Sequence, residues 1–284
     1  MRNEFRINEI CKEKGVTLKQ VAEAINIHPV SLTQALSSKG NPTFETLSKI
    51  ASYLNVEVSE LFRQSKPTIE LNKWEIYNSL NVITFRKLNQ KYGALSNMST
   101  EFGIKLFDIQ FIASEILYMI AGFKDKSMQE ELLKENNPTK TKRIFRNGVY
   151  LKYWRKDWNT FNIDWMKFCI MQKYAQNSKW VELLNSTNGK LILEDTTMQT
   201  GSTSFYWGAK DLLKGKIIRE LRKNKTQSKE QIESQIEEIY PNVGDNYFQG
   251  VNNMGKLLTL LRDNNGILNY SLPDNIYILE NKIN

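Results

Sequence analysis

The chain has 284 residues, more than the roughly 100–200 of a typical single domain, so we expect one large or two unequal domains. Hydrophobic residues make up 40% of it and charged residues 25%, which excludes a largely disordered, collagenous or coiled-coil protein. The formal net charge of +8 is compatible with nucleic acid or another polyanion as a partner.

The sequence predicts neither a membrane span nor a disulfide framework. Its longest apolar stretch, residues 111–123, contains Glu115 and is too short to cross a hydrocarbon layer of about 30 Å. The N-terminus lacks the apolar run of a secretory signal, and Cys11 and Cys169 are the only cysteines. We therefore expect a protein of the reducing cytoplasm with no membrane partner.

Short helical patterns fill the N-terminal segment. Residues 16–25 predict a buried helix. After a tight connection, a second helix begins with His28 as its N-cap and Pro29 at its first position, where a missing N–H costs nothing. A further helix capped by Thr43, followed by residues 56–62, completes a predicted five-helix unit.

This segment resembles the Cro/C1-type (XRE) helix-turn-helix family over about residues 4–62, on the strings TLKQVAEAINI, HPVSLTQAL and NPTFETLSKIASYLNVEVSELF. The resemblance implies that the second helix of the motif enters the major groove of double-stranded operator DNA, and that the protein is a homodimer on paired half-sites. The alternative is a module kept only for protein contacts. The DNA-contacting residues implied are Pro29, Val30, Ser31, Thr33, Gln34 and Lys39.

A linker is predicted around Pro67, because proline disfavours helix at the residue before it. We assign residues 1–65 to the helix-turn-helix domain, 66–82 to a linker and lead-in, and 83–284 to a second domain. Strand-like runs in the second domain are few, at residues 82–86, 191–194 and 276–279, and residues 215–238 look like a solvated helical face. The expected fold is mainly α, with a five-helix domain followed by a larger, mostly helical α+β domain.

Two titratable residues lie in apolar helical patterns of the second domain. Desolvation of Glu115 within SEILY would favour its protonated form and suit it to general acid or base catalysis, or Glu115 is a structural carboxylate that caps a neighbouring loop. Lys173 shares a helix face with Met166, Cys169 and Ile170. It is either a buried neutral amine able to attack a carbonyl, or its stem extends to water.

Aromatic and glycine-containing clusters follow. Residues 206–209 predict an aromatic turn, and residues 250–255 a loop that opens a helix ending near Arg262. Such features suit a nucleotide, because bases stack on aromatic rings and helix N-termini accept phosphate. A purely structural use of each cluster is the alternative.

Together these clusters resemble the NADAR (YbiA-like) family over about residues 83–264, on the strings YGALSNMS, SEILY, RKDW, LILE, YWGA and GVNNMGKLL. The resemblance implies N-glycosidic chemistry on nicotinamide- or ADP-ribose-related compounds. This includes removal of ADP-ribose from modified guanine in nucleic acid and, in another branch of the family, hydrolysis of riboflavin-pathway intermediates. It implies neither a cofactor nor a metal.

Matching the motifs position by position implies catalytic roles for Glu115, Lys173 and Asp157. Glu115 would stabilise an oxocarbenium ion or move protons, whereas in a second route Lys173 would open the ribose and form a Schiff base. The implied substrate-binding residues are Asn97, Tyr118, Trp158, Glu194, Trp207, Gly208, Asn252 and Arg262.

The chain also departs from the family pattern. Where relatives carry Gln and then Arg or Lys after the SExLY cluster, this chain has Met119 and Gly122, which implies the loss of a cationic group facing phosphate. Residues 202–204 stand where relatives often have an acidic residue. These departures imply a different substrate or impaired turnover.

The leading hypothesis is an operator-binding protein fused to an ADP-ribosyl-guanine glycohydrolase, acting as an antitoxin that controls its own operon. One alternative is a transcription factor that senses ADP-ribose or an NAD-derived nucleotide without hydrolysing it. Another is an N-glycosidase on phosphoribosyl-pyrimidine intermediates.

Overall fold

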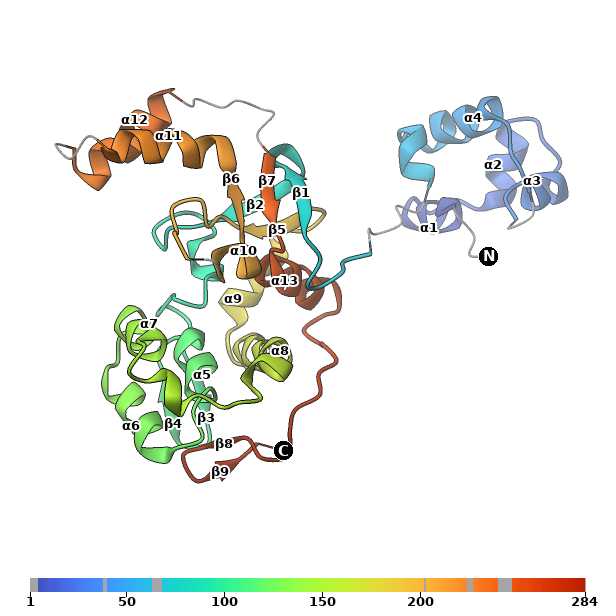
Figure 1. Ribbon diagram of the computed structural model, residues 1–284. Helices are drawn as coiled ribbons and strands as arrows, with labels where there is room; N and C mark the ends of the chain where they lie inside the picture. Colours follow the sequence, from blue (N-terminus) through green and yellow to red (C-terminus); the bar gives the residue numbers. More distant parts are fainter. Residues whose placement is uncertain are drawn as a thin grey trace. The chain divides into compact units, whose positions relative to one another are not determined.

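The computed structural model describes residues 5–37, 40–62, 68–201, 203–223, 227–239 and 247–283. The chain divides into two compact units, Met1–Thr68 and Ile69–Asn284, each with its own apolar core (Figure 1). Residues 69–82, which the sequence analysis assigned to a linker and lead-in, are part of the larger unit. No helix in the described ranges is long and apolar enough to cross a membrane.

The small unit contains the expected helices, and the fifth is a single 3-10 turn. Their N-termini are fixed as predicted, because His28 Nδ1 accepts a hydrogen bond from Val30 N and Thr43 Oγ1 accepts one from Thr46 N. The elements are α1 (Ile7–Glu13), α2 (Leu18–Ala24), α3 (Pro29–Ala35), α4 (Phe44–Leu54) and η1 (Val58–Leu61).

The large unit is mainly helical and has short strands (Figure 1). Its helices are α5 (Ser114–Ile120), α6 (Lys126–Lys134), α7 (Pro138–Arg146), α8 (Trp158–Gln176), α9 (Ser178–Asn185), α10 (Thr203–Trp207), α11 (Leu212–Lys223), α12 (Lys229–Ile239) and α13 (Asn253–Asp263). Single 3-10 turns are η2 (Ser79–Asn81), η3 (Gly93–Leu95) and η4 (Leu151–Tyr153).

The strands form one three-stranded and three two-stranded sheets. Strands β1 (Glu75–Asn78), β7 (Tyr247–Gly250) and β6 (Ala209–Asp211) pair antiparallel in the order β1-β7-β6. Strands β2 (Val82–Phe85) and β5 (Leu191–Glu194) pair in parallel. The others are the hairpins β3 (Ile104–Leu106) with β4 (Ile109–Phe111) and β8 (Tyr277–Ile278) with β9 (Asn281–Lys282). The three predicted strands are confirmed as β2, β5 and β8.

Helix α8 lies at the centre of the large core. It packs against α5, α9 and α13, and α13 lies along β5. The predicted apolar face of α8 is confirmed, since Met166, Cys169, Ile170 and Lys173 are all buried. Met166 and Trp158 of this helix line the cavities described below.

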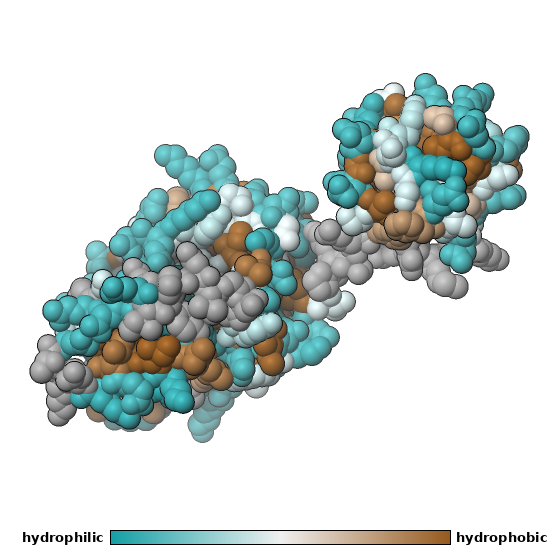
Figure 2. Space-filling model, turned by 90° about the horizontal axis from the view of Figure 1, so that it is seen from above, coloured by the Kyte–Doolittle hydropathy of each residue, from teal (hydrophilic) through white to brown (hydrophobic). Residues whose placement is uncertain are grey.

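Helices α11 and α12 form a hairpin that extends from β6, where the sequence predicted a solvated helical face (Figure 1). The hairpin has a small apolar cluster of its own, formed by Ile218, Ile232 and Ile236. On the side of the large unit seen in Figure 2, apolar residues reach the surface in patches divided by hydrophilic side chains.

Candidate functional site

Two adjoining cavities lie among α5, α7, α10 and β5. The first is lined by Phe85, Ser96, Asn97, Met98, Glu115, Tyr118, Lys142, Arg146, Met166, Glu194, Thr196, Gln199, Thr203, Ser204, Trp207 and Met254. The second is lined by Glu115, Tyr118, Met119, Phe145, Arg146, Trp154, Trp158, Asn159, Asn162, Thr203, Tyr206 and Trp207. The two cavities share the residues Glu115, Tyr118, Arg146, Thr203 and Trp207, so they meet at one wall.

Glu115 stands at this shared wall in the first turn of α5. Its backbone N–H donates to the carbonyl of Asn97, which ties the start of the helix to the loop that precedes it. One carboxylate oxygen of Glu115 lies 2.8 Å from the Lys142 ammonium. The carboxylate therefore has a charged partner, and Glu115 lines both cavities rather than capping a backbone loop.

Lys142 and Arg146 bring positive charge to the cavities, and the sequence analysis missed both. They are four residues apart on α7, a helix that begins with Asn137 as N-cap and Pro138 at its first position. No cation stands at Met119 or Gly122, but α7 supplies two cations to the first cavity from another part of the chain.

Gly122, just after α5, packs closely against α7. A Cβ atom at this position would lie 2.4 Å from the ring of Phe145, so a larger side chain requires that ring to shift. Met119, the other departure, is buried and lines the second cavity. Both departures from the family pattern shape the wall that brings α7 to Glu115.

Glu194 closes β5 and lines the first cavity. Burial raises the pKa of its carboxyl to about 7, with the Glu115 charge adding to the rise and Lys142 opposing it. Its backbone N–H donates to Asn252 Oδ1 at 3.0 Å, and Asn252 Nδ2 donates to the carbonyl of Ile192 at 2.9 Å. Asn252 thus holds the end of β5 and lines neither cavity.

Three predicted aromatic residues come together around the second cavity. The ring centroid of Tyr118 lies 5.0 Å from that of Trp158 and 5.5 Å from that of Trp207. Residues 206 and 207 were predicted in a turn but lie in the short helix α10, because residues 203–207 wind into a single helical stretch before β6. The result is an aromatic wall next to the charged one.

Asn97 also lies on the wall of the first cavity, as predicted. Its Oδ1 accepts a hydrogen bond from Ser114 Oγ at 2.9 Å, and its Nδ2 lies 2.9 Å from the sulfur of Met166. These contacts fix the side chain between the loop and helices α5 and α8.

Lys173 lies behind the cavity wall. Its ammonium donates to the carbonyls of Ala94 and Ser96 at 3.4 and 3.3 Å and sits 5.0 Å from the centroid of the Trp180 ring. The side chain is completely buried and does not extend to water, and burial lowers its pKa to about 7. Because Lys173 lines neither cavity, it contacts the site only through the loop that includes Ser96.

The structure places three other predicted site residues away from both cavities. Asp157 forms an ion pair with Arg155 at 2.7 Å, and this contact lowers the pKa of its carboxyl. Arg262 donates to the carbonyls of Thr187 and Lys190. Gly208 packs where a Cβ atom would lie 2.5 Å from the carbonyl oxygen of Glu194. These residues hold the fold together rather than line the site.

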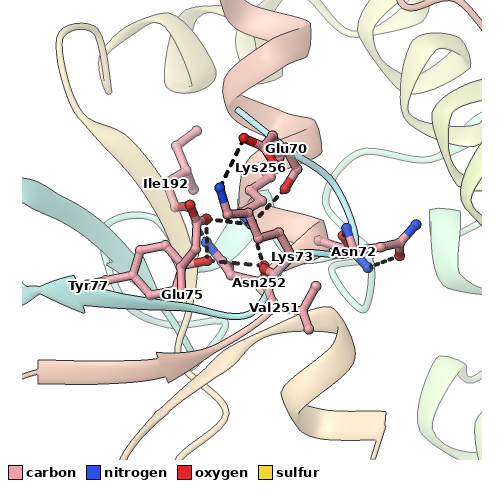
Figure 3. A network of polar contacts seen from close by, with 10 residues as sticks. Glu70, Asn72, Lys73, Glu75, Tyr77, Ile192, Val251, Asn252 and Lys256 are labelled. Atoms are coloured by element: carbon pink, nitrogen blue, oxygen red, sulfur yellow. Dashed lines mark hydrogen bonds and ion pairs between the residues drawn. The ribbon is translucent and has the colours of Figure 1, made fainter. Parts of the chain in front are cut away.

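A buried polar network ties the segment before β1 to α13 (Figure 3). The Lys256 ammonium donates to the carbonyls of Glu70 and Lys73 at 2.8 and 2.9 Å and lies 2.6 Å from the Glu75 carboxylate. Asn72 and Asn253 exchange two hydrogen bonds. Residues 69–75 are therefore held against α13. The N-cap of this helix, Asn252, accepts the hydrogen bond from the backbone of Glu194.

In the small unit, most of the predicted DNA-contacting residues share one exposed groove. It is lined by Leu18, Lys19, Pro29, Val30, Thr33 and Gln34. Ser31 is exposed on the same helix but does not line the groove, and Lys39 lies outside the described residues. The surface of α3 thus offers its first two turns to a partner. Across the described ranges no cluster of three or more His, Cys, Asp or Glu could hold a metal ion.

Comparisons with known proteins agree with this division. The helix-turn-helix family matches residues 7–61, and the NADAR domain family matches residues 84–264. Among solved structures, the NMR structure of the E. coli protein YbiA is 22% identical, with a TM-score of 0.45 over 65% of this chain and 84% of that chain. No curated protein matches. Because the NADAR match covers more than half of the chain, the chain belongs to the NADAR family, here joined to an N-terminal helix-turn-helix domain.

Proposed function

We propose that this chain is a DNA-binding protein whose NADAR domain hydrolyses the N-glycosidic bond between ADP-ribose and a modified guanine in nucleic acid. The observation that carries the proposal is the wall shared by the two cavities, where Glu115 is ion-paired with Lys142 and faces the aromatic rings of Tyr118 and Trp207. The charged side chains of the first cavity suit the pyrophosphate and ribose of ADP-ribose, and the aromatic rings of the second cavity suit a base.

The two cavity carboxyls suit different steps of such a cleavage. Breaking the C1–N bond leaves positive charge on the ribose, and an ionised Glu115 stabilises this oxocarbenium ion. Glu194 has a pKa of about 7, so part of the population carries a proton that it donates to the departing base. A water molecule then adds to C1 of the oxocarbenium ion and returns one proton to the Glu194 carboxylate. Lys142 and Arg146 bind the pyrophosphate. Lys173 holds the loop that includes Ser96 and does not attack C1.

The experiment that tests this function uses the purified full-length protein and an oligonucleotide that carries ADP-ribosylated guanine. We expect mass spectrometry to show free ADP-ribose and restored guanine. We expect a folded Lys173→Ala variant to keep measurable turnover. Loss of all turnover in a folded variant would instead support the route in which Lys173 forms a Schiff base. No release by the wild type, together with ADP-ribose binding by calorimetry, would identify a ligand-sensing regulator instead.

The polar network of Figure 3 favours this sensing role as the second candidate function. Asn252 connects the backbone of Glu194 with the start of α13, and Lys256 on the same helix holds the segment that leads from the small unit. A ligand that displaces the end of β5 therefore acts on the segment next to the helix-turn-helix domain. Operator binding measured with and without ADP-ribose tests this role.

The pKa of Glu194 predicts that ADP-ribose binding weakens as pH rises. The carboxyl is neutral below about pH 7 and becomes negative above it, next to the site proposed for the pyrophosphate. Because one proton is exchanged, we expect the affinity to fall by at most about tenfold per pH unit above pH 7. Calorimetry between about pH 6 and 8 measures this. Glu194→Gln, which cannot ionise, should show a clearly flatter profile than the wild type, because Lys173 still titrates in this range behind the wall. Equal profiles for the two proteins would contradict the proposed position of the anion.

For the helix-turn-helix domain we propose operator binding as a homodimer, in a protein that acts as an antitoxin and regulates its own operon. Gln34 is exposed in the groove of α3, and a glutamine amide pairs bidentately with adenine. We expect Gln34→Ala to reduce discrimination at one base pair by about 1–3 kcal/mol while leaving non-specific affinity nearly unchanged. Selection of binding sites from a random duplex library, followed by titration of single-base variants, measures this. Unchanged preference at every position would show that Gln34 does not read a base.

A further inference from the structure

The sheet β1-β7-β6 has one face in the core and one face turned away from it. Tyr77 and Phe248 are paired in register and buried on the inner face. The outer face carries a row in register across the three strands, formed by Ile76, Gln249 and Lys210. Ile76 is 64% exposed and Gln249 and Lys210 are half-buried, so among the described residues none covers the Ile76 end of this row.

Aromatic rings and a cation stand beside this row. Trp74, just before β1, is 52% exposed, and its ring centroid lies 5.1 Å from that of Phe205 in α10. The Lys210 ammonium lies 4.4 Å from the centroid of the Phe205 ring. Tyr247, at the other end of the paired strands, is 51% exposed. The outer face therefore combines accessible aromatic rings with positive charge.

The segment that carries Trp74 is anchored from the core side. Lys256 holds the carbonyl of Lys73, the residue before Trp74, and pairs with the carboxylate of Glu75, the residue after it (Figure 3). A ring on a fixed backbone loses little freedom when a partner stacks on it. The outer face is thus preorganised for binding.

Helix α10 separates this face from the catalytic cavities. Phe205 contacts Trp74 and Lys210, whereas Ser204 and Trp207 of the same helix line the first cavity. Lys210 Nζ also donates to the carbonyl of Gln199, which lines that cavity as well. The outer face therefore begins at the rim of the site.

Positive charge continues along α11. This helix contains five Lys and Arg residues and one acidic residue, Glu220, which pairs with Lys223. Burial lowers the pKa of the Lys210 ammonium most, and the charge of Arg219 in α11 lowers it further. Arg219 therefore lies close to Lys210. Cations next to aromatic rings match the chemistry of a single nucleic-acid strand, with phosphates near the cations and unstacked bases on the rings.

We propose that the outer face of β1-β7-β6, with Trp74, Phe205 and Lys210, binds a single-stranded stretch of DNA beside the base that enters the cavity. The stacking requires no particular base, because every base has a π-face. DNA is favoured because the same chain carries a DNA-binding domain. This inference depends on the proposed function in one respect, namely that the base entering the cavity is an ADP-ribosylated guanine.

Fluorescence anisotropy of the full-length protein with a labelled, unmodified oligothymidylate of about twelve nucleotides tests strand binding. We expect binding that weakens between about 50 and 200 mM salt. Trp74→Ala should weaken it about tenfold, and Trp74→Phe should restore most of the loss. The matched control is Tyr153→Ala, an exposed ring with Lys152 at 4.9 Å, which should bind like the wild type.

The proposal is overturned if the wild type does not bind, if Trp74→Ala and Tyr153→Ala bind alike, or if an oligouridylate of equal length binds more tightly. It is also overturned if sedimentation shows that Trp74→Ala dissociates a dimer, because the face would then join two copies. Kinetics separate this result from the proposed activity. Trp74→Ala should raise KM for an ADP-ribosylated oligonucleotide but not for the ADP-ribosylated mononucleotide. If the wild type binds the strand but turns over neither substrate, the proposed hydrolase activity is rejected and the proposed strand binding stands.

Discussion

Glu115→Gln is expected to lower the rate of ADP-ribose release by about 100-fold or more, the usual contribution of a positioned carboxylate in a charge-separating step. Glutamine keeps the size of the side chain but not its charge, so it cannot offset the positive charge that develops on the ribose. Lys142 is partly exposed and loses only its partner at 2.8 Å, so the fold should survive the change. Single-turnover release of ADP-ribose, followed by mass spectrometry, measures the effect.

Glu135→Gln is the matched control, because Glu135 pairs with Lys140 at 3.8 Å between α6 and α7 and lines neither cavity. Its rate should equal that of the wild type. A rate within about threefold of the wild type for Glu115→Gln, with unchanged thermal unfolding, would show that the carboxylate does not act on the reacting ribose.

The sequence could predict the residues whose signal is local. Glu115 stands out as a carboxylate in an apolar helix, and the spacing of Lys173 places it on an apolar face of α8 but leaves open whether its amine is buried or extends to water; in the structure it is buried. The same spacing does not decide what Lys173 contacts. Its acceptors, the carbonyls of Ala94 and Ser96, are 79 and 77 residues away in the chain, and only the tertiary fold brings them together.

The residues that sequence reasoning missed have signals that resemble ordinary surface patterns. Lys142 and Arg146 have the i, i+4 spacing of a solvated basic face, and the tertiary packing of α7 against α5 brings them to the cavities. Strands β2 and β5 were predicted because they are apolar runs, whereas the unpredicted strands, equally short, mix apolar and polar residues and are too short for an alternating pattern to emerge. For this reason the sheet beside Trp74 was not predicted, although its aromatic residues were visible in the sequence.

Lys256→Met should cause the largest loss of stability among the substitutions considered. Lys256 is buried, and methionine fills a similar volume but leaves the carbonyls of Glu70 and Lys73 without a donor and the Glu75 carboxylate without its partner. Glu75 keeps partial contact with water, which limits the cost, so we expect a loss of about 3 kcal/mol in the free energy of unfolding. For a unit of this size, the melting temperature should fall by about 6–12 °C. Thermal unfolding followed by circular dichroism measures it.

Lys73→Met is the matched control, since Lys73 pairs with Glu70 of the same segment at 3.0 Å but both side chains are exposed. Its effect should be about 0.5 kcal/mol or less. The double variant Lys256→Met/Glu75→Met should recover part of the loss, because the carboxylate left unpaired in the single variant is gone. If Lys256→Met unfolds like the wild type, the segment before β1 is not held by this network. In that case the proposed coupling between the cavity and the helix-turn-helix domain would be rejected, and so would the proposed anchoring of Trp74.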